Sequence, residues 1–295
     1  MKKLFVLAVM MAAVVCSCSR YELNEDVAED GSTENYAGEK KFTFTIKGDF
    51  MNPEFRDGAS RAANDYMVAD GVEMTDLWVI DYKDGVIKQE LHQSPSDADW
   101  GSPVMNLAVG THHIYFLASR GQGAAYENGI VKWTKPLDTF YLDYAVTVVK
   151  TSNGNRSVTL DRVATKMQLV IEDAVPTGTT AITFAPSVWY DGWDMINGVP
   201  TEAEGYSATV AIPETMWERS GTSLAVWSPS GKEEWLTDVK VQSMMGSNVD
   251  AAVIIKDVPL KANRATIYKG NLYSDNVANG VNLNAQWQTA YEGIF

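Results

Sequence analysis

The chain is 295 residues long and carries 38 acidic and 24 basic side chains, which gives a net charge of −14 at neutral pH. This acidity excludes a nucleic-acid-binding protein, because phosphate binding requires clustered lysine and arginine residues. Hydrophobic residues make up 45% of the chain, as in a folded protein of one large or two ordinary domains. Both cysteines, Cys16 and Cys18, lie near the N-terminus, which excludes disulfides and cysteine-ligated metal sites from the rest of the chain.

Residues 1–17 have the features of an export signal. Lys2 and Lys3 precede an apolar run at residues 4–15, which is too short to anchor the chain in a bilayer. Cys18 follows an apolar residue at −3 and a small residue at −1, a pattern that resembles the bacterial lipobox. We therefore expect residues 1–17 to be removed and Cys18 to be acylated, so that a lipid anchors the protein. An ordinary signal peptide cut at a small residue is the alternative.

Residues 18–41 are rich in acidic side chains and poor in apolar ones. This composition predicts an extended, solvated tether.

The following part of the chain is predicted to form β-strands. Residues 42–46 alternate apolar and polar side chains, which is typical of a half-buried strand. Residues 74–82 and 86–88 flank Asp84-Gly85, a strong hairpin signal. Further strands are expected at residues 105–109, 113–118 and 141–149. Turn residues at 152–155 end this first series, and we place a domain boundary there.

A second series of strands follows the boundary. They are expected at residues 158–160, 167–171, 181–184, 206–212, 223–227, 239–241, 252–255 and 265–273. Short strands spaced roughly 8–12 residues apart predict an all-β protein of two sandwich domains, residues 42–155 and 156–274. Only two short helices are expected, at residues 94–100 and 213–219, the second with Pro213 at its first position.

The C-terminal segment, residues 275–295, contains a further alternating run. Its apolar positions are Val281, Leu283, Ala285 and Trp287. One interpretation is a final edge strand of the second sandwich. The other is a strand presented to another subunit, since period-2 alternation suits strand addition to an open sheet.

No catalytic or metal-binding constellation is found in the sequence, so we expect neither an enzyme nor a cofactor. The adjacent His112 and His113 lie beside an apolar strand and are interpreted as a turn or strand-edge pair. The nine tryptophans allow glycan binding, because exposed indole rings stack on sugars. Trp193, which lies between Gly192 and Asp194, and Trp189 are the candidates. Burial of these side chains in a sandwich core is the alternative.

Several segments, taken in their order along the chain, resemble the fimbrillins, the type V pilus subunits of Gram-negative anaerobes. These segments are residues 17–19, 42–50, 58–62, 72–85, 107–118, 160–167 and 258–272. Residues 162–166 resemble the family's Arg-x-x-Ala-Lys segment, with Thr165 as an extra residue. The resemblance covers nearly all of the chain after the signal. It implies two tandem transthyretin-like β-sandwich domains of Greek-key topology.

The resemblance also implies a mechanism of assembly. Subunits travel to the outer membrane as lipoproteins, and a trypsin-like protease cuts after a basic residue, here Arg61 or Arg56. The cut displaces the first strand, and a strand from a neighbouring subunit fills the groove. The displaced strand would carry Phe42, Phe44 and Ile46, and the donor strand would carry Val281, Leu283, Ala285 and Trp287. The expected partners are other pilus subunits, the protease, the membrane and a host or bacterial surface ligand. Stalk, anchor and tip roles all stay open.

Overall fold

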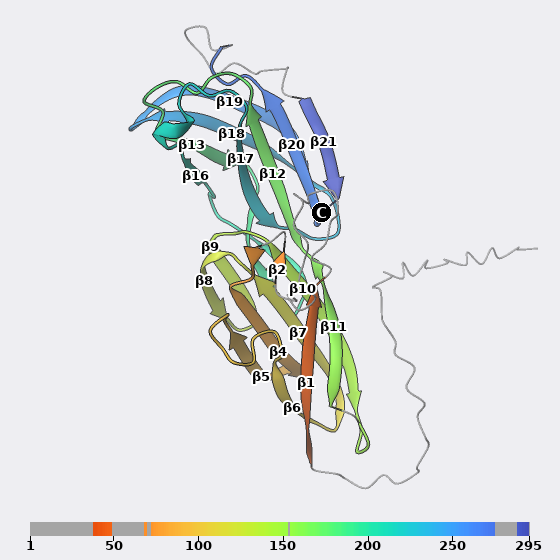
Figure 1. Cartoon of the computed structure of the whole chain (residues 1–295). Coiled ribbons are helices and arrows are strands. Elements are labelled where there is room, and N and C mark those ends of the chain that lie inside the picture. Colours follow the sequence, from red (N-terminus) through yellow and green to blue (C-terminus); the bar gives the residue numbers. More distant parts are fainter. Residues whose placement is uncertain (1–37, 49–67, 70–71, 153, 275–287, 295) are drawn as a thin grey trace, which may run out of the picture. The chain divides into compact units, whose positions relative to one another are not determined.

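The computed structural model describes residues 38–48, 68–69, 72–152, 154–274 and 288–294 (Figure 1). This part of the chain is built from strands, and its one described helix is a single 3-10 turn, Glu214–Met216. The all-β prediction is therefore confirmed. The predicted second helix shrinks to this turn, which Pro213 precedes in extended conformation.

The first sheet has seven strands in the order β5-β4-β7-β10-β11-β1-β6. Their bounds are β1 Glu39–Gly48, β4 Asp76–Lys83, β5 Val86–Gln93, β6 Val104–Ala108, β7 Gly110–Ser119, β10 Thr139–Val148 and β11 Asn155–Arg162. One hydrophobic core takes side chains from β1 and β6 and also from β4 and β7. Because both ends of the sheet face this core, the sheet curls over itself into two layers. The short strands β2, Val68–Ala69, and β3, Val72–Glu73, pair separately.

The predicted hairpin between β4 and β5 is confirmed. Asp84 and Gly85 have φ angles of 55° and 78°, the positive values that a two-residue turn requires. Aspartate and glycine tolerate this conformation better than most residues, which explains why the dipeptide marks the turn.

A second core lies between two four-stranded sheets, β17-β12-β20-β21 and β16-β13-β18-β19. Their bounds are β12 Ala164–Ile171, β13 Ala181–Pro186, β16 Ala208–Ala211, β17 Thr222–Pro229, β18 Trp235–Met245, β19 Asn248–Leu260, β20 Arg264–Gly270 and β21 Gln288–Ile294. Every predicted strand between residues 167 and 273 overlaps one of these. The sandwich prediction for this part of the chain is confirmed.

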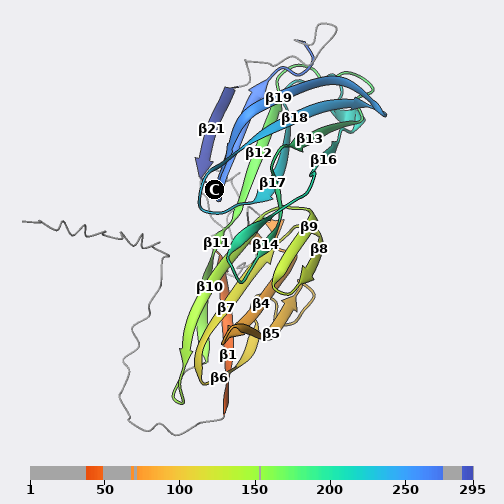
Figure 2. The same cartoon turned by 180° about the vertical axis from the view of Figure 1, so that it is seen from behind.

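A fourth sheet was not predicted. It joins β8 Gln122–Glu127 and β9 Ile130–Lys135 to β14 Tyr190–Asp194 and β15 Val199–Glu202, through pairing of β9 with β14 (Figure 2). Its side chains pack against Trp78 and Tyr115 on the outer face of β4 and β7. Both faces of β4 are therefore covered, which explains its run of five consecutive buried residues.

Two further predictions are corrected. Residues 94–100 form turns, not a helix, because the Asp97 carboxylate accepts a hydrogen bond from the backbone N–H of Ser94 at 2.6 Å. Such local side-chain bonds compete with helix formation. The domain boundary predicted after residue 155 would separate β11 from its partners β10 and β1. The change from the first core to the second lies instead at Val163, between β11 and β12.

Candidate functional site

Strand β1 lies inside the first sheet, between β11 and β6 (Figure 1). It runs parallel to β11 over six residue pairs, from Thr43 opposite Asn155 to Gly48 opposite Leu160. It runs antiparallel to β6 over five pairs, from Glu39 opposite Ala108 to Thr43 opposite Val104. The middle of β1, residues 43–46, is thus bonded on both sides, while its start pairs with β6 and its end with β11.

The inward side chains of β1 fill the first core. Phe42, Phe44 and Ile46, which the resemblance names as the apolar positions of the displaced strand, are fully buried. The Phe44 ring meets the Phe116 ring edge to face, with the centroids 5.2 Å apart. The Arg156 guanidinium lies over the Phe42 ring at 5.3 Å from its centroid. Burial of each of the side chains of Phe42, Phe44 and Ile46 stabilises the fold by about 1.5–3 kcal/mol.

The two neighbours of β1 depend on it to different extents. Strand β6 is at the end of the sheet, and β1 is its one sheet neighbour among the described strands. Strand β11 pairs with β10 as well, but only at Arg162 and Asp161. Strand β1 therefore joins β6 and most of β11 to the sheet.

Close approach of the backbones at Gly154 sets the start of the β1–β11 pairing. The N–H of Thr43 donates to the carbonyl oxygen of Gly154 at 2.6 Å. A Cβ atom at residue 154 would lie 1.9 Å from the carbonyl oxygen of Lys41, well inside van der Waals contact. Only glycine fits here, which gives this residue of the predicted turn a packing role.

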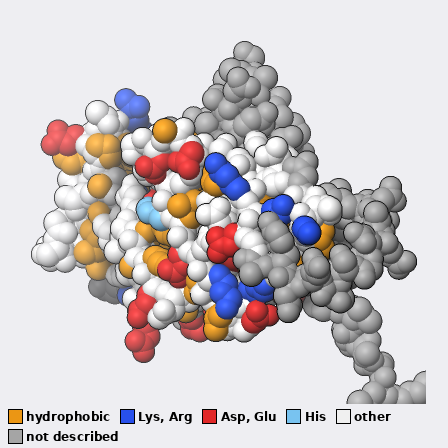
Figure 3. Space-filling view, turned by 90° about the horizontal axis from the view of Figure 1, so that it is seen from below, with side chains coloured by type: hydrophobic (Ala, Val, Ile, Leu, Met, Phe, Trp, Pro, Cys, Tyr) orange, Lys and Arg blue, Asp and Glu red, His pale blue; other side chains and the backbone are white. Residues whose placement is uncertain are grey.

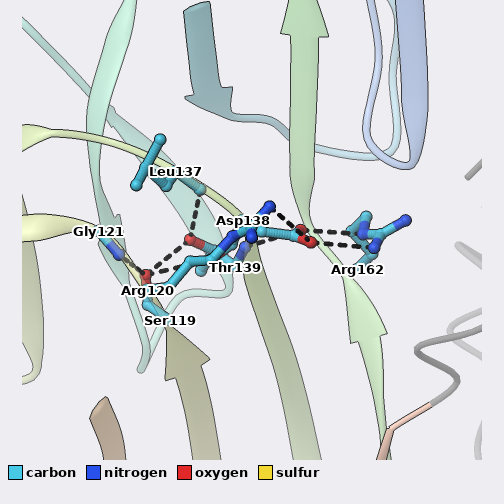
Figure 4. A network of polar contacts seen from close by, with 7 residues as sticks. All are labelled: Ser119, Arg120, Gly121, Leu137, Asp138, Thr139 and Arg162. Carbon is cyan, nitrogen blue, oxygen red and sulfur yellow. Dashed lines mark hydrogen bonds and ion pairs between the residues drawn. The ribbon is translucent and has the colours of Figure 1, made fainter. Parts of the chain in front are cut away.

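A buried ion pair holds the other end of β11 (Figure 4). Arg162 donates two hydrogen bonds to Asp138, from Nε to Oδ1 and from Nη2 to Oδ2, both at 2.9 Å. The carboxylate is fully buried, and the Nη2 atom of Arg120 lies 4.0 Å from it. Loss of one partner from such a pair is expected to cost about 3–5 kcal/mol, because the other charge stays buried.

The same network fixes the start of β10. Ser119 and Thr139 share a hydrogen bond between their hydroxyls at 3.0 Å, and the N–H of Gly121 donates to the Ser119 hydroxyl. The N–H of Val163 donates to the carbonyl oxygen of Thr139 at 2.9 Å. Arg162 lies in a segment that the family resemblance had marked, whereas Asp138 carried no sequence signal.

The histidines pair with carboxylates. His112 is buried in β7, with its Nδ1 atom 2.6 Å from Oδ1 of Asp81. The Nδ1 atom of His113 lies 2.9 Å from Oδ1 of Asp143. His92 forms a similar contact with Asp76 at 2.8 Å. Within the described ranges, no group of three or more His, Cys, Asp or Glu side chains is placed to hold a metal ion.

The tryptophans proposed for glycan stacking are buried, which corrects the prediction that Trp193 is exposed. Trp193 and Trp189 are only 2% and 1% exposed. The ring of Trp193 packs against Tyr141 with the centroids 5.2 Å apart, because the fourth sheet covers β4 and β7. The indole N–H of Trp189 donates to the carbonyl oxygen of Trp227 at 3.1 Å in the second core. A sugar cannot stack on either ring, so the alternative of core packing is confirmed.

Burial also affects the tyrosines beside Trp193. It raises the pKa of Tyr115 to about 12, and the pKa of Tyr141 is raised further by the same cause. The Tyr141 hydroxyl therefore stays protonated and donates to the carbonyl oxygen of Met195 at 2.7 Å. These groups tie the fourth sheet to the first and offer no reactive base.

The remaining predicted site residues lie outside the described part of the chain. They are Cys18, Arg56, Arg61, Val281, Leu283, Ala285 and Trp287. Strand β21 begins at Gln288, directly after the predicted donor segment, and pairs antiparallel with β20 at the edge of its sheet. None of the helices in the described ranges has the length and apolar character needed to cross a membrane.

The surface combines different side-chain types. On the face shown in Figure 3, acidic and basic side chains are interspersed with hydrophobic ones. Of the features described, β1 and the two strands that enclose it form the best-defined candidate site.

No protein-family model matches the chain, and no curated protein sequence matches it significantly. Solved structures do resemble it. A candidate polysaccharide-binding protein from Bacteroides thetaiotaomicron is 11% identical, with a TM-score of 0.49, over 78% of this chain and 92% of that chain. A candidate adhesin from the same species is 9% identical, with a TM-score of 0.48, over 88% and 96%. The tip fimbrial protein Mfa3 from Porphyromonas gingivalis, with a C-terminal truncation, is 13% identical, with a TM-score of 0.41, over 80% and 97%. Candidate adhesins and a fimbrial protein are thus among the solved structures that this chain is similar to.

Proposed function

We propose that this chain is a structural subunit of a cell-surface pilus of the type V class, which is exported as a lipoprotein, assembled by strand exchange and used for adhesion. The observation that supports the proposal most directly is the position of β1. It is the first described strand, and it lies inside its sheet between β11 and β6. Its removal would open a slot with a strand on each side.

The energetics favour refilling of such a slot. Without β1, the sites of Phe42, Phe44 and Ile46 would be empty, and the facing backbone groups of β6 and β11 would lose their partners. Refilling would regain about 1.5–3 kcal/mol for each buried side chain and about 0.5–1.5 kcal/mol for each hydrogen bond. An incoming strand with alternating large apolar side chains meets both requirements.

The C-terminal segment of a neighbouring subunit is the proposed donor. Val281, Leu283, Ala285 and Trp287 supply apolar side chains at alternating positions. The following strand, β21, lies at the edge of its sheet, where a strand can leave without opening the sheet. The partner in this proposal is another pilus subunit, either a copy of this chain or a different one.

The N-terminal part of the chain supplies the other steps. Acylated Cys18 would hold the subunit at the outer membrane through its lipid. Arg56 and Arg61 lie in sequence between β1 and β2, so one cut by a trypsin-like protease after either residue would separate β1 from the rest of the protein. The ligand at the adhesive surface would be a host or bacterial surface molecule.

The proposal is tested by treating the purified chain with a trypsin-like protease and measuring its size by light scattering. We expect release of an N-terminal fragment that ends at Arg61 or Arg56, followed by polymers. Chains lacking residues 279–295 should be cut normally and stay monomeric, and the double variant R56A/R61A should stay uncut. A cut wild-type chain that remains strictly monomeric, with or without other pilus subunits, would refute assembly by strand exchange.

The lipid anchor has a separate test. In cells grown with a labelled fatty acid, the wild-type chain should incorporate the label, and the Cys18→Ser variant should lack it. Equal labelling of the two chains would contradict acylation at Cys18.

A further inference from the structure

Side chains, instead of a strand, bond to the outer edge of β6 at Asn106 and Ala108. In an antiparallel pair, the backbone groups of alternate residues point toward the partner strand and away from it. The carbonyl oxygens of Pro103 and Gly101 accept hydrogen bonds from the N–H groups of Phe44 and Ile46 in β1. The backbone groups of odd-numbered residues in this segment therefore point toward β1. The backbone groups of Asn106 and Ala108 therefore point to the outer edge.

Gln89 of β5 bonds to both outward groups of Asn106. Its Nε2 atom donates to the Asn106 carbonyl oxygen at 2.5 Å, and its Oε1 atom accepts from the Asn106 N–H at 3.3 Å. Gln89 lies two residues from Leu91, which packs against the first core, so both side chains point from β5 into the sandwich. The amide thus reaches across the open side of the sandwich and takes the place of a neighbouring strand.

His112 holds the next outward group of β6. Its Nε2 atom donates to the Ala108 carbonyl oxygen at 2.7 Å, since a carbonyl oxygen can only accept. Its Nδ1 atom bonds to Oδ1 of Asp81 in β4 at 2.6 Å, and both residues are 1% exposed. The buried carboxylate fixes the orientation of the ring. In addition, Nζ of Lys83 donates to the carbonyl oxygen of Val109 at 2.5 Å.

None of these bonds involves β1. We propose that Gln89 and His112 keep β6 in position when β1 leaves, so that the slot stays preformed and strands can add only at its inner edge. This inference rests on the proposed strand exchange. It makes Gln89 and His112 positioning residues for strand capture, and it explains why the end strand of the sheet does not offer a second site for strand addition.

The sealed edge also determines which strand fits. A strand that takes the place of β1 in the same direction runs antiparallel to β6 and parallel to β11. It must place large apolar side chains where Phe42, Phe44 and Ile46 lie. The preferred partner is therefore an extended segment with three apolar residues at alternating positions.

The test uses the full chain with a specific protease site inserted within residues 49–67. After cleavage, β1 is exchanged in mild urea for a labelled synthetic peptide of Glu39–Gly48, and fluorescence anisotropy gives the rate of capture. The variants are Gln89→Ala, Gln89→Glu and His112→Gln, and the matched control is Lys88→Ala at the exposed neighbouring position of β5. Hydrogen exchange of residues 104–108 in the uncut chains is measured in parallel.

We expect the Gln89→Ala change to slow capture about fivefold, as loss of roughly 1 kcal/mol of hydrogen bonding predicts. The Gln89→Glu change should slow it more, because a carboxylate would face the Asn106 carbonyl oxygen. Exchange at residues 104–108 should speed up in both variants, and the Lys88→Ala chain should behave as the wild type. The His112→Gln chain should also capture slowly if it folds, and the Gln89 variants decide the matter if it does not.

Two results would overturn the inference. One is capture by the Gln89 variants at the rate of the Lys88→Ala control. The other is failure of the cut wild-type chain to take up the Glu39–Gly48 peptide at all. A labelled peptide of residues 279–295 separates this inference from the proposed function. If that peptide is refused by a slot that accepts Glu39–Gly48, the proposed donor is wrong, while the role of Gln89 and His112 stands.

Discussion

Replacement of Phe44 by alanine should destabilise the first core and leave the second largely intact. The Phe44 side chain is fully buried, and its ring contacts Phe116 at 5.2 Å and Tyr144 at 6.2 Å between centroids. A Phe→Ala change in a core costs about 3–5 kcal/mol, since burial is lost and a cavity remains. A typical domain has only about 5–15 kcal/mol of net stability, so this loss is a large fraction of it.

The effect is best measured region by region, because a chain with separate cores need not unfold in one step. Hydrogen exchange followed by mass spectrometry should show faster exchange in β4, β7 and β10, whose inward side chains share the core with Phe44. Exchange in β12 and β20 should change little, because those strands belong to the other core. Thr45→Ala is the matched control, since Thr45 is the next residue of β1 and is only half-buried.

The core role of Phe44 is refuted if the Phe44→Ala and Thr45→Ala chains exchange alike, or if Phe44→Ala lowers the free energy of unfolding by less than about 1 kcal/mol. Either result would mean that β1 does not complete the first core. Faster exchange throughout both cores would instead mean that they unfold together.

Three further changes test separate parts of the structure. Gly154→Ala should weaken the β1–β11 pairing by about 1–3 kcal/mol, because the new Cβ meets the Lys41 carbonyl oxygen, and unchanged exchange in β1 would contradict this. Trp193→Ala should lower the free energy of unfolding by about 3–5 kcal/mol in urea titrations, and a loss of glycan binding without a loss of stability would contradict its core role. Burial raises the pKa of the Asp191 carboxyl above its usual 3.8. The protonated carboxyl therefore stabilises the fold fully below pH 3.8. This stabilisation is lost as the pH rises, so that ionised Asp191 weakens the fold at neutral pH. Asp191→Asn should therefore raise the melting temperature at pH 7 but not below pH 3.8, and a gain that is independent of pH would refute this cause.

Local patterns in the sequence were sufficient to predict most of the strands. Alternation at residues 42–46 marks β1, and Asp84-Gly85 marks the turn between β4 and β5, because both depend on the conformation of a few adjacent residues. The pattern of β1 also predicts that Phe42, Phe44 and Ile46 lie on one face of the strand. The family resemblance added the interpretation of β1 as a displaceable strand, which nothing local in the chain could supply.

The fourth sheet depends on residues far apart in the chain. Strands β9 and β14 are separated by more than fifty residues and pair only because both cover the outer face of β4 and β7. Strand β14 has only five residues, one of them glycine, and β9 alternates over only six residues, so both were missed, and with them the burial of Trp193. An alternating pattern predicts that one face of a strand is buried, but it does not indicate which strand or sheet covers that face.

The candidate site itself combines both sources of information. The residues of β1 follow from the sequence, whereas its enclosure by β11 and β6 is decided by pairing across more than sixty residues of chain. The same holds for the Gln89–Asn106 and Asp138–Arg162 contacts, whose side chains have no periodic signal. Hydrophobic periodicity is a property of neighbouring residues, while hydrogen-bond and ion-pair partners are chosen by the packing of distant ones. The sequence alone therefore determined most of the segments that become strands, and the tertiary structure decided which of them form the slot and which side chains hold its walls.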